Sequence, residues 1–402
     1  MTPPPTTGLD LRRTGFGPAP DAEAVRDGEG IARVPTPFGP TAWMLTRQAD
    51  VRRMLGDADA FANGWTPDDL SGDDGAVRRD PRQLSGDRTG NLLSLDPPDH
   101  TRLRRLLAGE FTVRRMRRLE PRIVEIVDDH LDALARSGPP ADLVAQYALP
   151  IPSLVICELL GVPPGDQAEF QERTNAQLDT GLTEERRDAL AAEALAYMQG
   201  LVARARREPG EDLIGMLLRE HSEDLTNDEL VGIANLLLVA GHETTANMLG
   251  LGTLALLRHP DQLARVRDDE EAVAPAVEEL MRWLSIVSNG SPRLARRDVE
   301  IDGVTIRRGD LVVFNLPAAN RDPAVVDDPE RFDITRDGPP HVAFGHGVHH
   351  CLGAPLARME MRIAYPALLR RFPTLHLAVP DDDVAWATTH AIHGLERLPV
   401  AW

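Results

Sequence analysis

Cys351 has the clearest chemical potential in this sequence. A glycine-punctuated turn precedes it, and a strongly helical pattern, Ala354 to Arg371, follows it directly. A cysteine at the start of a helix faces unpaired backbone N–H groups and the positive end of the helix dipole. Both favour the thiolate over the thiol, and the thiolate is the form that binds a metal. The position therefore predicts a metal-binding sulfur.

The residues before and after this thiol favour one kind of metal group. They read Phe344-Gly-His-Gly-Val-His-His-Cys-Leu-Gly353, and glycines leave room for a flat, bulky group to lie against the backbone. The pattern favours a haem iron with one axial cysteine. A small buried hydrophobe is an alternative for a lone cysteine. Zinc is another, although structural zinc usually requires paired ligands. The histidines near the thiol are His341, His346, His349 and His350, and the glycines are Gly345, Gly347 and Gly353.

A second constellation lies in the longest helical pattern, where the sequence reads Ala240-Gly-His-Glu-Thr-Thr245. Thr226-Asn-Asp-Glu229 is a capping box that begins this helix, and we expect it to run to Arg258. Gly241 weakens the helix, and a threonine can bond back to a carbonyl one turn earlier. We therefore expect a local opening of the backbone ladder. Ordinary polar residues of a buried helix are the alternative.

Two further patterns place charged side chains on one helical face. Glu279 and Arg282 lie three residues apart, which puts a carboxylate and a guanidinium on the same face of the helix. His100 and Arg104 lie four apart on a first helical turn, which suits an anionic group. Exposed helix charge is the alternative for this second pair.

Taken in order along the chain, these motifs resemble those of cytochrome P450 monooxygenases, especially soluble bacterial members of streptomycete type. The resemblance runs from about residue 30 to the C-terminus. It implies the cytochrome P450 fold, mainly α with a small β portion, and haem b with a cysteine thiolate as axial ligand. Cys351 is then the iron ligand and Phe344 packs beside the sulfur. Thr244 is expected to hydrogen-bond dioxygen, and Glu243 to relay protons.

The resemblance also assigns the surroundings of the porphyrin. His100 and Arg104 are expected to bind one haem propionate, and Arg293 and His349 the other. Gly345 and Gly353 belong to the loop against the porphyrin. The resemblance also implies that Glu279 and Arg282 are scaffold that ties their helix to the coil before the cysteine, with Arg331 as a third member. A hydrophobic substrate is expected against seven apolar residues, each of which could equally be core: Leu92, Leu93, Val239, Ala240, Ile286, Val287 and Ile392.

The implied activity is insertion of one oxygen atom from O2 into a hydrophobic small molecule, by hydroxylation or epoxidation. The expected substrate is a secondary metabolite such as a macrolide, polyketide or terpenoid. Electrons would come from NAD(P)H through a separate ferredoxin and reductase, because this chain has no flavin or iron–sulfur motif. A peroxide-driven haem-thiolate enzyme and a non-enzymatic haem sensor or carrier are the alternatives. Glu243 and Thr244 argue against the first, and no DNA-binding or signalling segment supports the second.

Composition limits the partners. The net charge of −19 argues against broad nucleic-acid binding. All 44 basic residues are arginine, which excludes Schiff-base catalysis and a phosphate-binding Walker lysine. One segment runs against the acidic balance, and it predicts a dock for a ferredoxin-type donor or, alternatively, a solvated helical face. Its arginines are Arg102, Arg104, Arg105, Arg114, Arg115, Arg117, Arg118 and Arg122.

The elements that would position these residues can be read from the hydrophobic pattern. Residues 98 to 285 are largely helical, whereas residues 60–92 form an irregular connection and 317–343 a coil. The remaining predicted elements are a strand at Thr41–Thr46, a helix near Ala49–Leu55, a hairpin at Val299–Ile306 with an Asp-Gly turn, and a strand at Leu311–Asn315.

We expect a single haem domain over residues 1–402, with a disordered tail at 1–10. Two distant cysteines imply no disulfide framework. The longest nearly apolar stretch, Ile233 to Ala240, is too short to span a bilayer, and no secretory signal is visible. A cytoplasmic monomer is therefore expected.

Overall fold

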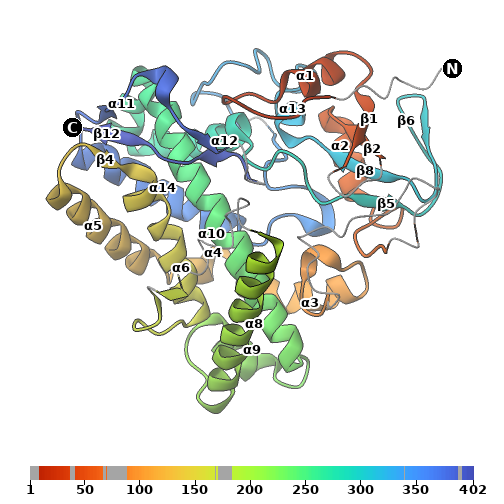
Figure 1. The fold of residues 1–402 in the computed structure, drawn as a ribbon, viewed down its shortest axis with the longest axis horizontal. Helices are drawn as coiled ribbons and strands as arrows, with labels where there is room; N and C mark the ends of the chain where they lie inside the picture. Colours follow the sequence, from red (N-terminus) through yellow and green to blue (C-terminus); the bar gives the residue numbers. More distant parts are fainter. Residues whose placement is uncertain are drawn as a thin grey trace.

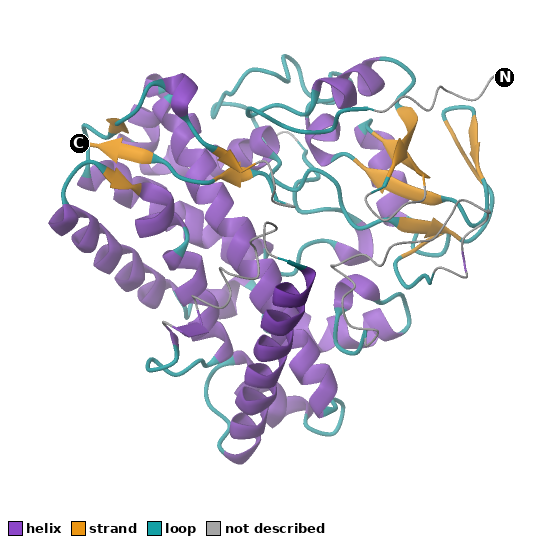
Figure 2. Ribbon diagram, in the orientation of Figure 1, coloured by secondary structure: helices purple, strands orange, loops and turns teal. Residues whose placement is uncertain are grey.

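The computed structural model describes residues 9–36, 41–66, 69, 88–167, 169–170, 183–338, 340–387 and 392–402. Helices dominate, and most strands gather at one side of the molecule (Figures 1 and 2). The helices are α1 (Pro20–Asp27), α2 (Gln48–Gly56), α3 (Asp99–Ala108), α4 (Val113–Met116), α5 (Glu120–Ser137), α6 (Pro150–Leu160), α8 (Glu184–Arg207), α9 (Leu213–His221), α10 (Asn227–Leu257), α11 (Pro260–Asp268), α12 (Glu270–Leu284), α13 (Leu316–Asn320) and α14 (Ala354–Arg371).

The strands form one larger sheet and three small ones. The larger sheet has the order β1-β2-β8-β5-β3, in which only β2 and β8 are parallel. The bounds are β1 (Ile31–Pro35), β2 (Thr41–Leu45), β3 (Phe61–Ala62), β4 (Ala141–Asp142), β5 (Arg293–Ala295), β6 (Val299–Ile301), β7 (Val304–Ile306), β8 (Leu311–Phe314), β9 (His376–Leu377), β10 (Trp386–Ala387), β11 (Gly394–Leu395) and β12 (Pro399–Ala401).

Several predicted elements are confirmed. The strands expected at residues 41–46 and 311–315 are β2 and β8, and the expected short helix is α2. The β6–β7 hairpin turns at Asp302 and Gly303, whose φ values of 47° and 75° are those of a type I′ turn. The helix after the cysteine loop has the predicted bounds. A mainly helical protein with a small β portion is therefore correct.

The long helix α10 is continuous, so the expected opening of its ladder is wrong. Its 31 residues span about 46 Å. Thr226 and Glu229 form the predicted capping box, with hydrogen bonds of 3.1 and 2.9 Å. Thr244 does bond back to the Ala240 carbonyl, at 2.8 Å. A carbonyl oxygen has two lone pairs, so it accepts this hydroxyl without losing its helical partner.

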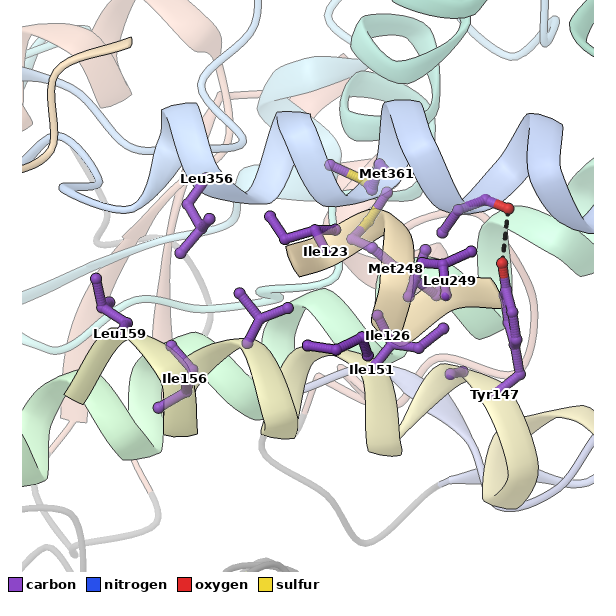
Figure 3. Close-up of a cluster of buried hydrophobic side chains, with 14 of the residues drawn as sticks. Ile123, Ile126, Tyr147, Ile151, Ile156, Leu159, Met248, Leu249, Leu356 and Met361 are labelled. Carbon is purple, nitrogen blue, oxygen red and sulfur yellow. Dashed lines mark hydrogen bonds between the residues drawn. The ribbon is translucent and has the colours of Figure 1, made fainter. Parts of the chain in front are cut away.

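The main core fixes α10 against the helix that follows the cysteine loop. In Figure 3, Met248 and Leu249 of α10 meet Met361 of α14 and isoleucines of α5 and α6. Tyr147 donates a hydrogen bond of 2.8 Å to the Ala364 carbonyl of α14. Burial of these side chains stabilises the fold by about 1.5–3 kcal/mol each. The packing therefore holds both motif-bearing helices in one rigid arrangement.

Other parts of the chain differ from the sequence prediction. The expected coil at 317–343 contains most of α13, which Asn315 caps by accepting from the Ala318 N–H at 3.0 Å. Asp10 donates its N–H to Asp21 at 2.6 Å, so the expected tail does not extend to residue 10. Residues 1–8 of that tail, and 67–68 and 70–87 of the irregular connection, lie outside the described part. Among the described helices, none has the length and apolar character that a bilayer crossing requires.

Candidate active site

The loop that carries Cys351 is fixed by backbone contacts. The Cys351 N–H donates to the Phe344 carbonyl at 2.8 Å. Gly345 and Gly347 have φ values of 73° and 70°, where glycine is favoured. A Cβ at Gly347 would lie 2.3 Å from the Leu55 carbonyl oxygen, so the loop sits directly against α2. A Cβ at Gly353 would meet no described atom within 4 Å, which leaves open space on that side of the loop.

The surroundings of the Cys351 sulfur have opposing effects on its pKa. The residue is exposed, yet the surrounding protein removes enough hydration that its pKa is raised above the usual value. Backbone N–H groups of Gly353 and Ala354, and the charges of Arg104 and Arg358, act in the opposite direction. The helix start thus favours the thiolate as expected, but desolvation has the larger effect on the pKa of the sulfur in the protein without a metal. A positive metal ion at the sulfur would supply the missing stabilisation.

The other cysteine is a core residue. Cys157 lies fully buried in α6 within the main hydrophobic cluster. Burial raises its pKa to about 12, so it stays a neutral thiol. The small-hydrophobe alternative thus describes Cys157, whereas Cys351 has the accessibility that a metal ligand requires.

A second layer of residues holds the loop from the side of α14. Arg358 lies over the Phe344 ring at 4.4 Å and pairs with Glu278 at 2.6 and 2.8 Å. His341 also contacts Glu278, at 3.2 Å. Although burial opposes it, these hydrogen bonds lower the pKa of Glu278 to about 2. His341 is thereby committed to a carboxylate, and no group of three potential metal ligands occurs within the described ranges, so the zinc alternative has no support.

Four cationic or potentially cationic side chains gather near this loop. His100 and Arg104 come from α3, Arg293 from β5, and His349 from the 3-10 turn before Cys351. The rings of His100 and His349 lie 4.2 Å apart, and the Arg104 guanidinium donates to the His350 carbonyl at 2.5 Å. None of the four forms an ion pair with a carboxylate of the described residues, although Arg293 is only 7% exposed.

The electrostatics of this cluster are unfavourable by themselves. Burial, followed by the charges of Arg293, His100 and Arg104, lowers the pKa of His349 to about 3. Burial lowers the pKa of Arg293 to about 10. Both ring nitrogens of His100 are buried without a partner among the described residues. Buried polar groups are normally hydrogen-bonded, so this arrangement fits an anionic ligand with several acceptor oxygens. The two propionates of a haem have that chemistry.

The oxygen-site candidates lie in the middle of α10. Glu243 is buried, and its carbonyl accepts from the Asn247 amide at 3.0 Å. The Thr244 hydroxyl donates to Ala240, so its lone pairs remain available to accept. Val239, one turn earlier, is 40% exposed, which is unusual for an apolar residue at the centre of such a helix. The mid-helix therefore presents apolar surface beside a hydroxyl.

The predicted substrate residues occupy three places. Leu92 and Leu93 form a 3-10 turn after Gly90, whose Cβ position would lie 2.3 Å from the Glu229 carbonyl of α10. Val239 and Ala240 are exposed on α10 itself. The remaining three come together after α12: Val287 pairs with Ile392, and the Ile286 carbonyl accepts from His393 at 2.9 Å. Leu92 and Ile286 are buried members of the main core.

The scaffold pair is fully buried and saturated. Arg282 makes two hydrogen bonds of 2.8 Å to Glu279 and further bonds to the carbonyls of Asn320, Pro329 and Arg331. Arg331, the expected third member, takes part through its carbonyl, which accepts from Arg282 at 3.3 Å, and not through its side chain. The Arg331 guanidinium is exposed and pairs with Asp333 at 3.2 Å, since its chain position directs only the carbonyl inward. Arg336 supplies the third side chain, 3.3 Å from Glu279.

Two residues near the cationic cluster have no counterpart in the sequence prediction. The Asn63 side-chain nitrogen lies 2.5 Å from Nε2 of His349. Asp96 accepts the backbone N–H groups of Asn63 and Gly64 at 2.9 and 3.0 Å and pairs with Arg296 at 2.8 Å. Asp96 stands directly before Pro97-Pro98 and the His100 motif, which was an available signal. Asn63 had none, because 286 positions separate it from His349.

Comparison with known proteins gives a consistent result. The family model described as "Cytochrome P450" matches residues 178–384. Cytochrome P450 FAS1 of Rhodococcoides fascians is 48% identical over 394 residues, covering 98% of both chains. Mycinamicin IV hydroxylase/epoxidase of Micromonospora griseorubida is 41% identical over 382 residues, covering 94% of both.

Solved structures agree. The LnmA cytochrome P450 hydroxylase from the leinamycin pathway of Streptomyces atroolivaceus superposes with a TM-score of 0.88 at 42% identity, covering 98% of this chain and 99% of that one. Such identity over nearly the whole length accompanies the motif order described above. The chain belongs to the cytochrome P450 family, and it is a haem-thiolate monooxygenase.

Proposed function

We propose that Cys351 is the axial thiolate of the haem and that His100, Arg104, Arg293 and His349 hold its propionates. The strongest support is the cluster of two arginines and two histidines that form no ion pair with a carboxylate in the described chain. Backbone N–H groups of Gly353 and Ala354 would stabilise the thiolate once iron offsets its desolvation. Haem, when bound, supplies the redox-active iron that activates dioxygen.

Proton delivery is assigned to α10. The Thr244 hydroxyl can leave the Ala240 carbonyl and donate toward an acceptor on the exposed side of the helix. Glu243, the adjacent buried carboxyl, is the residue that would return a proton to it. The apolar face of Val239 and Ala240 limits water beside this pair, which keeps proton delivery selective.

The substrate is inferred to be a hydrophobic secondary metabolite. The seven candidate contacts are apolar, and the relatives include a mycinamicin hydroxylase/epoxidase and a leinamycin-pathway hydroxylase. An apolar pocket with few polar groups suits a macrolide, polyketide or terpenoid. Hydroxylation or epoxidation of such a skeleton is the reaction we propose.

The electron donor is inferred to be an acidic ferredoxin, and its dock is narrower than the arginine-rich segment. Several of those arginines are already paired: Arg102 with Glu229, Arg115 with Glu110 and Glu220, and Arg122 with Glu125 and Glu158. Exposed Arg114, Arg117 and Arg118 have no ion pair with a described carboxylate. Arg114 directly follows Val113 in α4, and Arg117 stands at the C-cap of that helix; Val113 itself is 58% exposed. An apolar centre with a charged rim is typical of a docking site.

Substitution of each cysteine tests the iron ligand. Cys351→His should abolish the red-shifted Soret band of the reduced carbon monoxide adduct, whereas Cys157→Ala, the matched control, should leave it unchanged. Retention of the band in the Cys351 variant would show that this residue is not the iron ligand.

Substitution of Thr244 tests the proposed proton route. Thr244→Ala should keep the Soret band but divert reducing equivalents from product to peroxide. Full coupling of electron use to product formation in that variant would contradict the proposed route.

Charge reversal tests the dock. Arg117→Glu and Arg118→Glu together should slow reduction by ferredoxin at low salt by about tenfold or more, because they reverse the steering charge. Arg307→Glu with Arg308→Glu, between β7 and β8, is the matched control, since it reverses two adjacent exposed arginines elsewhere. Equal rates in both variants would exclude this face.

A further inference from the structure

Asn63 makes an unusual contact with His349. Its side-chain nitrogen lies 2.5 Å from Nε2 of the imidazole. Two nitrogens can share a hydrogen bond only if one of them has a lone pair, and an amide nitrogen has none to offer. With the amide oriented as in this structure, its nitrogen donates to Nε2, and Oδ1 of Asn63 is buried without a partner among the described residues. A neutral imidazole that accepts at Nε2 carries its proton at Nδ1.

This tautomer suits binding of a carboxylate. Nδ1–H is a donor, and within the described ranges no group accepts from it. With the opposite tautomer, Nδ1 would present a lone pair, which repels a carboxylate oxygen. Metal-binding and anion-binding histidines are commonly fixed in this way by a partner on the second ring nitrogen. Asn63 occupies the position of such a partner.

Asn63 is itself held firmly. It is buried, and Asp96 accepts both its backbone N–H and that of Gly64. The nearby Trp65 donates its indole N–H to the Pro292 carbonyl at 3.1 Å, one residue before Arg293. The Asp96 carbonyl also accepts the His100 N–H at 3.0 Å. Residues 63–65 after β3 thus contact the His349 ring, the Pro292 carbonyl before Arg293, and Asp96, whose own carbonyl accepts from His100.

We propose that Asn63 is a positioning residue for the haem: it fixes the Nδ1–H tautomer and the ring orientation of His349, so that this histidine donates to a propionate. The inference rests on the propionate role of His349 proposed above. It adds a residue from β3's exit loop to a site otherwise built by α3, β5 and the cysteine loop.

The tautomer can be read directly in the holoprotein. In the ferrous carbon monoxide complex, which is diamagnetic, ¹⁵N NMR of labelled protein should show His349 with an unprotonated Nε2 and a protonated Nδ1. Comparison with His349→Ala identifies the signals. A protonated Nε2 on His349 would overturn the proposal without any variant of Asn63.

Transfer of haem to apomyoglobin measures the consequence. His349→Ala and Asn63→Leu should each accelerate haem loss on the order of tenfold, because an outer partner of a ligand contributes about that much. The double variant should lose haem no faster than His349→Ala alone. Asn63→Ala, which cannot overpack the site, should behave as Asn63→Leu does.

The outcomes are distinct. If Asn63→Leu accelerates haem loss equally in the His349→Ala background, Asn63 acts only on the fold and the proposal is wrong. If His349→Ala accelerates loss but both Asn63 variants do not, the proposal fails while the propionate role stands. If His349→Ala has no effect, the propionate role fails, and the positioning role with it.

Discussion

Two buried arginines lie in opposite electrostatic states. Arg282 is fully buried and bonds to the Glu279 carboxylate and three carbonyls. Arg293 is almost as buried, but no described group forms an ion pair with it, and burial lowers its pKa to about 10. A buried charge is tolerated only when paired. The first arginine therefore completes the scaffold, while the second is the one for which we propose a haem propionate as partner.

The presence or absence of partners distinguishes a structural arginine from a candidate ligand-binding one more clearly than the degree of burial does. Sequence motifs drew attention to both arginines for reasons of position in the chain. Only the contacts distinguish a saturated site from an unsaturated one. Applied to the cysteines, the same criterion assigns Cys157 to the core and Cys351 to a ligand. The following substitutions test whether saturation is the correct criterion.

The largest effect is expected at the saturated site. Arg282→Leu leaves the Glu279 carboxylate buried with only Arg336 nearby among the described cations, which should lower the free energy of unfolding by about 3–5 kcal/mol. The double variant Glu279→Leu with Arg282→Leu is the matched control. It removes both charges and should be less destabilised than the single variant. Urea unfolding monitored by circular dichroism measures both, and a single-variant loss below about 1 kcal/mol would contradict the scaffold role.

At Arg293, which has no ion pair with a described carboxylate, a substitution should have opposite effects in the apoprotein and in the holoprotein. Arg293→Leu removes an unpaired buried charge, so the apoprotein should be unchanged or more stable by about 1 kcal/mol. The holoprotein should instead lose haem about tenfold faster, since one charge-assisted bond to a propionate is missing. Urea unfolding of the apoprotein and haem transfer to apomyoglobin give the two values. Strong destabilisation of the apoprotein would make Arg293 a scaffold residue like Arg282.

The sequence predicted those features that local rules determine. The capping box of Thr226, the Asp302–Gly303 turn and the helix after Cys351 depend on neighbours in the chain, and all are confirmed. Features that depend on distant contacts were missed. The choice of Arg336 over Arg331, and the contact of Asn63 with His349, arise only when separate segments meet.

The helix start acts on the Cys351 sulfur in the expected direction, but its effect on the pKa is not the largest one. The helix start after Cys351 was expected to favour the thiolate, and the sulfur does accept from the N–H groups of Gly353 and Ala354. Desolvation raises its pKa nevertheless, and a sequence gives no measure of how much protein surrounds a residue. The ladder of α10 shows the same limit: Thr244 back-bonds as expected, yet the helix remains continuous.

His242 provides a test of which property identifies a ligand site: a buried polar group without a hydrogen-bond partner, or a buried charge without an ion pair. Its imidazole is fully buried, both nitrogens lack partners among the described residues, and burial lowers its pKa to about 4. Because this pKa is depressed, the unfolded chain binds more protons below pH 6.5, and stability falls as the pH drops toward 4. At pH 5 the loss is about 2 kcal/mol.

His242→Leu should remove that acid-dependent loss while leaving haem retention unchanged, because a neutral group needs no counter-ion. Thermal unfolding from pH 4.5 to 7.5 measures the dependence, with the native protein as reference. Faster haem loss in this variant would show that a missing partner alone, without charge, already marks the ligand site.

The smallest effect distinguishes the two candidate third members of the scaffold. Arg336 bonds to the Asp327 and Asp328 carbonyls at 2.6 Å and lies beside Glu279, whereas Arg331 is exposed and pairs only with Asp333 among the described residues. Arg336→Leu should cost about 1–2 kcal/mol through the carbonyls left without a donor. Arg331→Leu, the matched control, should stay within about 0.5 kcal/mol, because exposed ion pairs contribute little. A larger loss of stability for Arg331→Leu than for Arg336→Leu in urea unfolding would mean that the exposed Arg331 side chain stabilises the scaffold more than the Arg336 side chain does. Pairing by buried contacts would then not be the property that distinguishes a scaffold residue from a ligand-binding one.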